Sequence, residues 1–228
     1  MRHWLTALAL LVALPASQPA AAAPFTVRLG ADRIVLDAPP GFSDTTELAS
    51  PRLQELAETL TSASNRILLF ALSDADLRRF MTGDQIEARR YMIAVTPKGL
   101  EYQRVSPDQF AAYVADSLQG LGRAVESPEL IKFLESQPIG KANLISELRK
   151  EPALVSVMQA TRLPELPGTT FWGSKKPQYL CFTTTVFLVR GKALQLSAYT
   201  LYDSPADVDW LRGITERWMN ELLRLNSR

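Results

Sequence analysis

The chain has 228 residues, 46% of them hydrophobic and 21% charged, and its formal net charge at pH 7 is +1. This composition is that of an ordinary globular protein. A chain so close to neutral lacks the excess of positive charge with which proteins bind nucleic acid, so we expect no nucleic-acid partner.

The first 22 residues have the pattern of a cleaved secretory signal. Arg2 gives the start a positive charge, an apolar run follows over residues 4–14, and alanines occupy positions 20–22. The run is too short to cross a bilayer, which needs about 20 apolar residues, so a cleaved signal is favoured over an uncleaved membrane anchor. We predict cleavage after Ala22 and a soluble product with no integral membrane segment, because no later apolar stretch is long enough to span a membrane.

Cleavage at that position leaves one domain, residues 23–228, exported to a bacterial periplasm or secreted further. It also removes His3, the only histidine of the chain, which excludes Ser-His-Asp and Cys-His catalytic groups and histidine-based zinc sites. The single cysteine, Cys181, allows no internal disulfide. We therefore expect no cofactor, no metal, and a fold stabilised by its hydrophobic core alone.

The mature chain opens with two strand-like runs, FTVRL and RIVLDAP, on either side of Gly30-Ala31-Asp32, which predicts a hairpin. NRILLFALS and RRYMIAVTP then predict two strands, separated by a short helix that begins at Ser73 or Asp74. Residues 123–151 predict two short helices broken at Pro138-Ile139-Gly140. ALVSVMQATRL predicts a further strand.

Four helix starts share one signature, a serine followed by a proline. The serine hydroxyl accepts an N–H of the first turn, and the proline has no N–H to leave unpaired. Gln109 also completes a capping box with Ser106. Apolar residues at helical spacing follow, which predicts packing on a core; the last helix, rich in tryptophan and arginine, could instead lie on a membrane surface, but core packing is favoured. The four starts are Ser50-Pro51, Ser106-Pro107, Ser127-Pro128 and Ser204-Pro205.

Residues 178–204 predict a final hairpin that turns at Arg190-Gly191-Lys192. Cys181 lies in the middle of its first strand, on a mainly apolar face. Free cysteine is among the most buried residue types and buried thiols are inert, so Cys181 is interpreted as core packing rather than as a nucleophile or redox thiol. The predicted face carries Cys181, Thr183, Thr185, Phe187 and Val189 on one strand and Leu194, Leu196, Ala198 and Thr200 on the other.

Together these elements predict an α/β (α+β) fold, with a mostly antiparallel central sheet and helices packed on its faces in an α/β/α sandwich. RIVLDAPPGF is similar to the strand and following Pro-x-Gly-Trp/Phe near the start of PsbP-like domains. The hairpin TTVFLVRGKALQLSAYT and the helix DVDWLRGITERWMNELLRLN resemble the closing elements of those domains. The resemblance implies a central antiparallel sheet between helices and an accessory or protein-interaction role.

The segment most suggestive of binding is LPELPGTTFWGSKKPQY, residues 163–179. It is rich in turn formers, and two aromatic residues lie beside two lysines, a combination typical of recognition surfaces. The alternative is that both aromatic side chains fold inward and plug an end of the sheet. The candidate binding residues are Phe171, Trp172, Lys175 and Lys176.

Two aspartate clusters and one group of arginines are weaker candidates. Neighbouring aspartates could bind a hard cation, but carboxylates in a first helical turn are explained by the helix dipole, so we predict no metal site. The arginines predict a solvated face, with a ligand-facing role as the alternative. The clusters are Asp74 with Asp76, and Asp203 with Asp207 and Asp209; the arginines are Arg78, Arg79, Arg89 and Arg90.

Motifs for nucleophilic catalysis and phosphate binding are missing from the sequence, which has no GxSxG, no S-x-x-K pair, no GxxxxGK loop and no GxGxxG. We predict an exported, non-catalytic protein that binds a protein or an envelope component. The alternatives are a histidine-free hydrolase built on paired carboxylates, and a small-molecule carrier that uses the space between sheet and helices.

Overall fold

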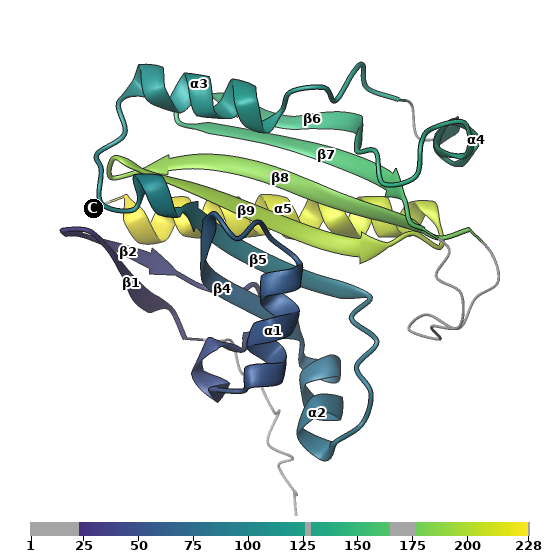
Figure 1. Cartoon of the computed structure of the whole chain (residues 1–228), viewed down its shortest axis with the longest axis horizontal. Helices are drawn as coiled ribbons and strands as arrows, with labels where there is room; N and C mark the ends of the chain where they lie inside the picture. Colours follow the sequence, from purple (N-terminus) through teal and green to yellow (C-terminus); the bar gives the residue numbers. More distant parts are fainter. Residues whose placement is uncertain (1–22, 126–128, 165–176, 228) are drawn as a thin grey trace, which may run out of the picture.

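A seven-stranded antiparallel sheet forms the centre of the molecule (Figure 1). The structure is a computed structural model and describes residues 23–125, 129–164 and 177–227. The strand order is β3-β4-β5-β9-β8-β7-β6, and every neighbouring pair is antiparallel. These strands are β3 (Phe42–Asp44), β4 (Asn65–Ser73), β5 (Arg90–Pro97), β6 (Asn143–Glu151), β7 (Leu154–Arg162), β8 (Tyr179–Val189) and β9 (Lys192–Leu201).

Helices cover both faces of the sheet, which confirms the predicted α/β/α sandwich (Figure 1). The first face packs against α5 (Pro205–Asn226), α4 (Leu130–Glu135) and a separate hairpin of β1 (Phe25–Leu29) and β2 (Asp32–Leu36). The second face packs against α1 (Pro51–Thr59), α2 (Asp74–Thr82) and α3 (Pro107–Ser117). Two 3-10 turns, η1 (Thr46–Leu48) and η2 (Lys98–Leu100), follow β3 and β5.

The longest helix, α5, lies on the first face through a buried stripe at helical spacing, as predicted. Leu211 and Trp218 are almost fully buried in the main core. The indole Nε1 of Trp218 donates a hydrogen bond to the carbonyl of Asp37 (2.8 Å). The side-chain amide of Asn226 bonds the backbone of Val35 in both directions, at 2.9 and 2.8 Å, so α5 also holds the β1–β2 hairpin. In the part of the chain that the structure describes, no helix is both long and apolar enough to cross a membrane.

The β8–β9 hairpin confirms the predicted turn and face. Arg190 and Gly191 have positive φ angles of 52° and 78°, which suit a two-residue turn. The register pairs Cys181 with Thr200, and the face that they share is buried on the α5 side. Burial raises the pKa of the Cys181 thiol to about 12, and the negative charge of Asp207 adds to the effect. Cys181 is therefore core packing.

The prediction of two helices within residues 123–151 is half wrong. The first helix is α4, but the second is the edge strand β6, which pairs with β7. Two β-bulges interrupt the register of this pair. Because of them, Ile145 and Leu148 pack against the same core although they are three residues apart, a spacing that mimics a helix.

Three of the four predicted helix starts are confirmed, because α1, α3 and α5 each have proline at the first helical position. At α3, the Ser106 hydroxyl accepts from the Gln109 backbone (3.3 Å), and the Gln109 side chain accepts from the Ser106 backbone (2.9 Å). At α1, the Ser50 side chain makes no capping hydrogen bond. Ser127 lies outside the described residues.

Candidate functional site

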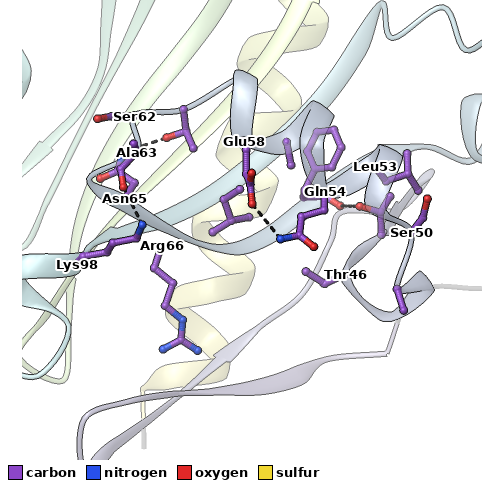
Figure 2. Close-up of a pocket in the computed structure, with 16 residues that line it drawn as sticks. Thr46, Ser50, Leu53, Gln54, Glu58, Ser62, Ala63, Asn65, Arg66 and Lys98 are labelled. Carbon is purple, nitrogen blue, oxygen red and sulfur yellow. Dashed lines mark hydrogen bonds between the residues drawn. The ribbon is translucent and has the colours of Figure 1, made fainter.

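A cleft of about 500 Å³ lies between α1 and the first half of β4 (Figure 2). Its walls come from η1, α1, the turn that follows α1, and the start of η2. This arrangement brings together parts of the chain that are up to about fifty residues apart in sequence. The lining residues are Thr45, Thr46, Ala49, Ser50, Leu53, Gln54, Ala57, Glu58, Thr61, Ser62, Ala63, Asn65, Arg66, Ile67, Phe70 and Lys98.

The cleft exists because α1 contacts the sheet along a narrow row. Within this short helix only Leu53 and Ala57 are buried, at 2% and 3% exposure, while Leu56 is half-buried. A second cleft, of about 540 Å³, lies on the opposite side of α1, toward α2. Gln54 lines the first cleft and Glu55 lines the second, so consecutive residues of α1 face different hollows.

The floor of the first cleft is apolar and its rim is polar. Leu53, Ile67 and Phe70 provide apolar surface that belongs to the smaller core between α1 and the sheet. On the rim, Gln54 donates a hydrogen bond to Glu58 (2.9 Å), as Figure 2 shows. Such a combination suits binding, because apolar surface supplies affinity and a few polar groups fix orientation.

Charged side chains lie at the end of the cleft where β4 begins. The guanidinium of Arg66 forms an ion pair with Glu101 and donates to the carbonyl of Arg28 (3.1 Å). The ammonium of Lys98 donates to the carbonyl of Ala63 (2.7 Å), and the figure shows it beside the strand (Figure 2). Among the described residues Lys98 has no ion pair, so its charge is available to an anionic group.

The outer edge of β4 is only partly covered. β3 pairs with Ala71, Leu72 and Ser73 and then ends. At Phe70, the backbone N–H of Thr45 donates to the carbonyl (2.8 Å) and the Asp44 carboxylate accepts from the N–H (3.2 Å). Within residues 65–69, all but Leu68 pair with β5 on one side, where the register shifts between Ile67 and Leu69, and no described strand pairs with them on the other. This open edge runs beside the cleft.

The candidate binding residues predicted from the sequence, Phe171, Trp172, Lys175 and Lys176, lie outside the described residues. The loop therefore remains a prediction.

The four arginines do not form one surface. Arg78 is exposed, and Arg79 is an exposed partner of Glu87. Arg89 and Arg90 are half-buried, and they pair with Asp203 and Asp207 at the start of α5. The prediction of a solvated face is therefore correct for Arg78 and Arg79 alone.

Asp203 and Asp207 hold the start of α5 to β5. Asp203 pairs with Arg89, and Asp207 pairs with Arg90 at 2.9 Å. The Arg90 guanidinium also lies 4.1 Å from the centre of the Trp210 ring. Burial alone would raise the pKa of Asp207, but hydrogen bonds from two backbone N–H groups and from Arg90 hold this pKa below its ordinary value.

The other aspartate cluster also makes internal contacts. Asp74 accepts from the Ser43 hydroxyl (2.8 Å), and Asp76 accepts from the Ser73 hydroxyl (2.9 Å) and the Glu87 backbone (2.8 Å). Ser73 is the N-cap of α2, which confirms one of the two helix starts that the sequence predicted. Over the described ranges, no group of three acidic, cysteine or histidine side chains is placed to hold a metal ion.

Sequence reasoning missed the cleft, although it predicted the elements that form it. The hydrophobic stripe of α1 indicates a helix packed on a core. It does not show that a cleft separates Gln54 and Glu58 from the neighbouring loops. The only available signal was the shortness of the stripe, since few apolar residues anchor the helix. Lys98 reaches the site through the tertiary fold, which no local pattern reports.

Comparisons with known proteins add little to this geometry. No protein-family model matches the chain, and no curated protein matches it. Among solved structures, the crystal structure of the Ran-binding protein Mog1p of Saccharomyces cerevisiae is similar with a TM-score of 0.37 and 11% sequence identity. The match covers 91% of this chain and 94% of that one. A likeness of this strength carries no argument about function.

Proposed function

We propose that the protein is an exported, non-catalytic binding protein of the bacterial periplasm, and that its α1–β4 cleft receives part of a protein or of another envelope component. The observation that carries the proposal is the cleft, which has a polar rim and the half-buried side chain of Ile67 at its apolar floor. Its volume of about 500 Å³ is within the usual range of ligand sites. The accessory role implied by the resemblance to PsbP-like domains agrees with this proposal.

The chemistry of the lining suits recognition. Around the floor, Gln54, Asn65 and Lys98 carry side-chain donor groups with more than one N–H, each of which makes one internal hydrogen bond, to Glu58, Thr61 and the Ala63 carbonyl. A bound segment would cover apolar surface and satisfy its polar groups at the rim, which is the usual division between core and rim in an interface.

Export is proposed from the leader pattern of residues 1–22. Expression of the full chain in a bacterial host, followed by fractionation and intact-mass measurement, tests this part. We expect a periplasmic product that begins at Ala23. A product that retains the leader in the membrane or cytoplasmic fraction would contradict it.

The binding site is tested by two substitutions at consecutive positions of α1. Gln54→Trp fills the first cleft, and Glu55→Trp places the same side chain toward the second. Both wild-type residues are exposed, so neither change disturbs the core. The immobilised protein and both variants are incubated with envelope extract, and bound components are identified by mass spectrometry.

We expect Gln54→Trp to reduce recovery of the specific partner about tenfold and Glu55→Trp to leave it within about twofold, since a tenfold change corresponds to about 1.4 kcal/mol. Equal recovery by both variants would contradict the cleft as the binding site. Trp172→Ala is a third arm, because it tests the candidate loop: loss of the partner in this variant, with retention in Gln54→Trp, would assign binding to the loop instead.

A further inference from the structure

The geometry points to an extended peptide as the occupant of the cleft. We propose that a segment of about six residues pairs with the open edge of β4 at residues 65–69, antiparallel to β4, with its carboxyl end at Lys98. This inference rests on the proposed binding function and adds to it the class of ligand and the mode of binding.

The backbone of β4 sets the direction of the bound segment. β3 runs antiparallel to β4, with Phe42 opposite Ser73 and Asp44 opposite Ala71. After Thr45 the chain leaves the edge and enters η1. A peptide placed in line with β3 continues the sheet along residues 69 to 65, because an unpaired strand edge presents N–H and C=O groups that another extended backbone can satisfy.

The opposite edge of the sheet is less suited to strand addition, although β4 itself has one register shift, between Ile67 and Leu69. β6 carries two bulges, and its solvent side includes Lys150 and Glu151. Bulges and charged residues are the means by which natural sheets prevent strand addition. Part of this edge is also occupied, since the backbone of Leu144 bonds Leu121 (3.2 Å) and Val125 (3.1 Å). Residues 65–69 of β4 contain a single charged residue, Arg66, which is already paired.

The side chains of such a peptide alternate between two environments. Those on the cleft side face the apolar floor, where Ile67 is half-buried while Leu53 and Phe70 are almost fully buried, so apolar residues are expected at alternate positions. Gln54 lies on the polar rim of the same cleft (Figure 2). The expected ligand therefore has the alternating pattern of a half-buried strand.

Charge complementarity identifies the carboxyl end. An antiparallel segment in line with β3 ends beside Asn65 and Lys98, which both line the cleft. The Lys98 ammonium is held in place by the Ala63 carbonyl (2.7 Å) and has no described ion pair. A terminal carboxylate, or an aspartate or glutamate at the last position, is the matching group.

The test uses fluorescein-labelled hexapeptides of the form Thr-Leu-Thr-Val-Thr-Asp, varied at the two apolar positions, and fluorescence anisotropy with the purified mature protein. Two further versions carry N-methyl groups on the odd or on the even residues. Strand pairing uses the N–H groups of alternate residues only, so we expect one N-methylated version to bind at least about tenfold more weakly and the other to change less than about threefold. Equal effects of both versions would overturn strand pairing.

A second arm tests Lys98 and the direction of the peptide. Amidation of the peptide's carboxyl terminus together with Asp→Asn at its last position is expected to weaken binding about three- to tenfold, as is Lys98→Met. Because both changes remove the same contact, their combination should weaken binding no more than either alone. Lys150→Met at the other edge is the matched control and should have no effect. Additive losses would place the carboxyl end elsewhere and overturn the proposed direction.

The outcomes separate this inference from the proposed function. If no hexapeptide of the panel binds at about 1 mM, or if binding persists in Gln54→Trp, the peptide mode is wrong. If Gln54→Trp nonetheless loses its envelope partner, the cleft remains the binding site and only the peptide mode is rejected. The remaining alternative is that a second copy of the chain occupies the edge of β4, which sedimentation analysis tests. A dimer that dissociates in Gln54→Trp would support this alternative and overturn the inference.

Discussion

The helices α1 and α5 begin with the same sequence signature and serve different purposes. α5 has nine buried residues, hydrogen bonds to the β1–β2 hairpin and an ion pair to β5. α1 has two buried residues, no side-chain cap and a cleft on each side. A Ser-Pro start therefore indicates where a helix begins, while the number of buried side chains decides whether the helix closes the core or borders a site.

The two helices are also expected to contribute differently to the stability of the fold. Removing groups beneath α5 should weaken the whole fold, since that side contains the main core. Removing groups beneath α1 should affect a smaller cluster and leave the rest of the sheet in place.

Thiol labelling should show the largest contrast. Burial raises the pKa of Cys181 to about 12, so iodoacetamide at pH 8 should modify the native protein about 10³-fold more slowly than the unfolded chain. In a Cys181→Ala background, Ala57→Cys places the thiol under α1 instead. We expect labelling at least tenfold faster than at Cys181, because α1 can open locally. Equal protection at both positions would show that α1 is as firmly anchored as α5.

Matched leucine truncations compare the two packing interfaces. Leu211 under α5 is 0% exposed and Leu53 under α1 is 2% exposed. We expect Leu211→Ala to lower the free energy of unfolding by about 4 kcal/mol and Leu53→Ala by about 2 kcal/mol, because the cleft lets the smaller site collapse. Urea unfolding measures both values, and a larger loss for Leu53→Ala would reverse the comparison.

Asp207→Asn should weaken the start of α5 by about 1–2 kcal/mol at neutral pH, since it removes the charged partner of Arg90 and the charged cap. The folded pKa of Asp207 is lowered, so its contribution is complete above the unfolded pKa of about 4 and is lost as pH falls through the folded value. Urea titrations from pH 7 to pH 2.5 should therefore show the two proteins converging. A constant difference across this range would contradict the assigned role.

Cap substitutions should give the smallest effects. Ser106→Ala removes a hydroxyl that accepts a backbone N–H, with an expected loss of about 1 kcal/mol. Ser50→Ala removes a side chain with no capping bond, and the change should stay below about 0.3 kcal/mol. Thermal unfolding of both variants provides the measurement. A similar loss in both would mean that Ser50 caps α1 in solution.

The fold was predictable where local patterns and tertiary structure agree. The alternation of apolar residues in 178–204 predicted the β8–β9 face, and positive φ at Arg190 and Gly191 fits the turn chosen from sequence. The prediction failed at β6, where bulges change the spacing of buried residues from two to three and so imitate a helix. These residues form a strand because they pair with β7. A short window of sequence does not show which segments pair with one another.

The candidate site was less predictable than the fold. Gln54 and Lys98 have no motif around them, and only the tertiary fold brings both into the lining of one cleft. The role of Asp207 was more predictable, because its place in the first turn of α5 indicated a structural carboxylate; it accepts hydrogen bonds from the backbone of Asp203 and Ser204 and pairs with Arg90. Clustering in sequence identified structural residues, whereas the cleft arises from long-range packing.

Amide hydrogen exchange with and without a saturating partner tests the central claim most directly. If the α1–β4 cleft is the binding site, exchange should slow by about tenfold or more in residues 65–69 and in α1, while β6 and α5 remain unchanged. Slowed exchange confined to β6, to α5 or to residues 165–176 would contradict it.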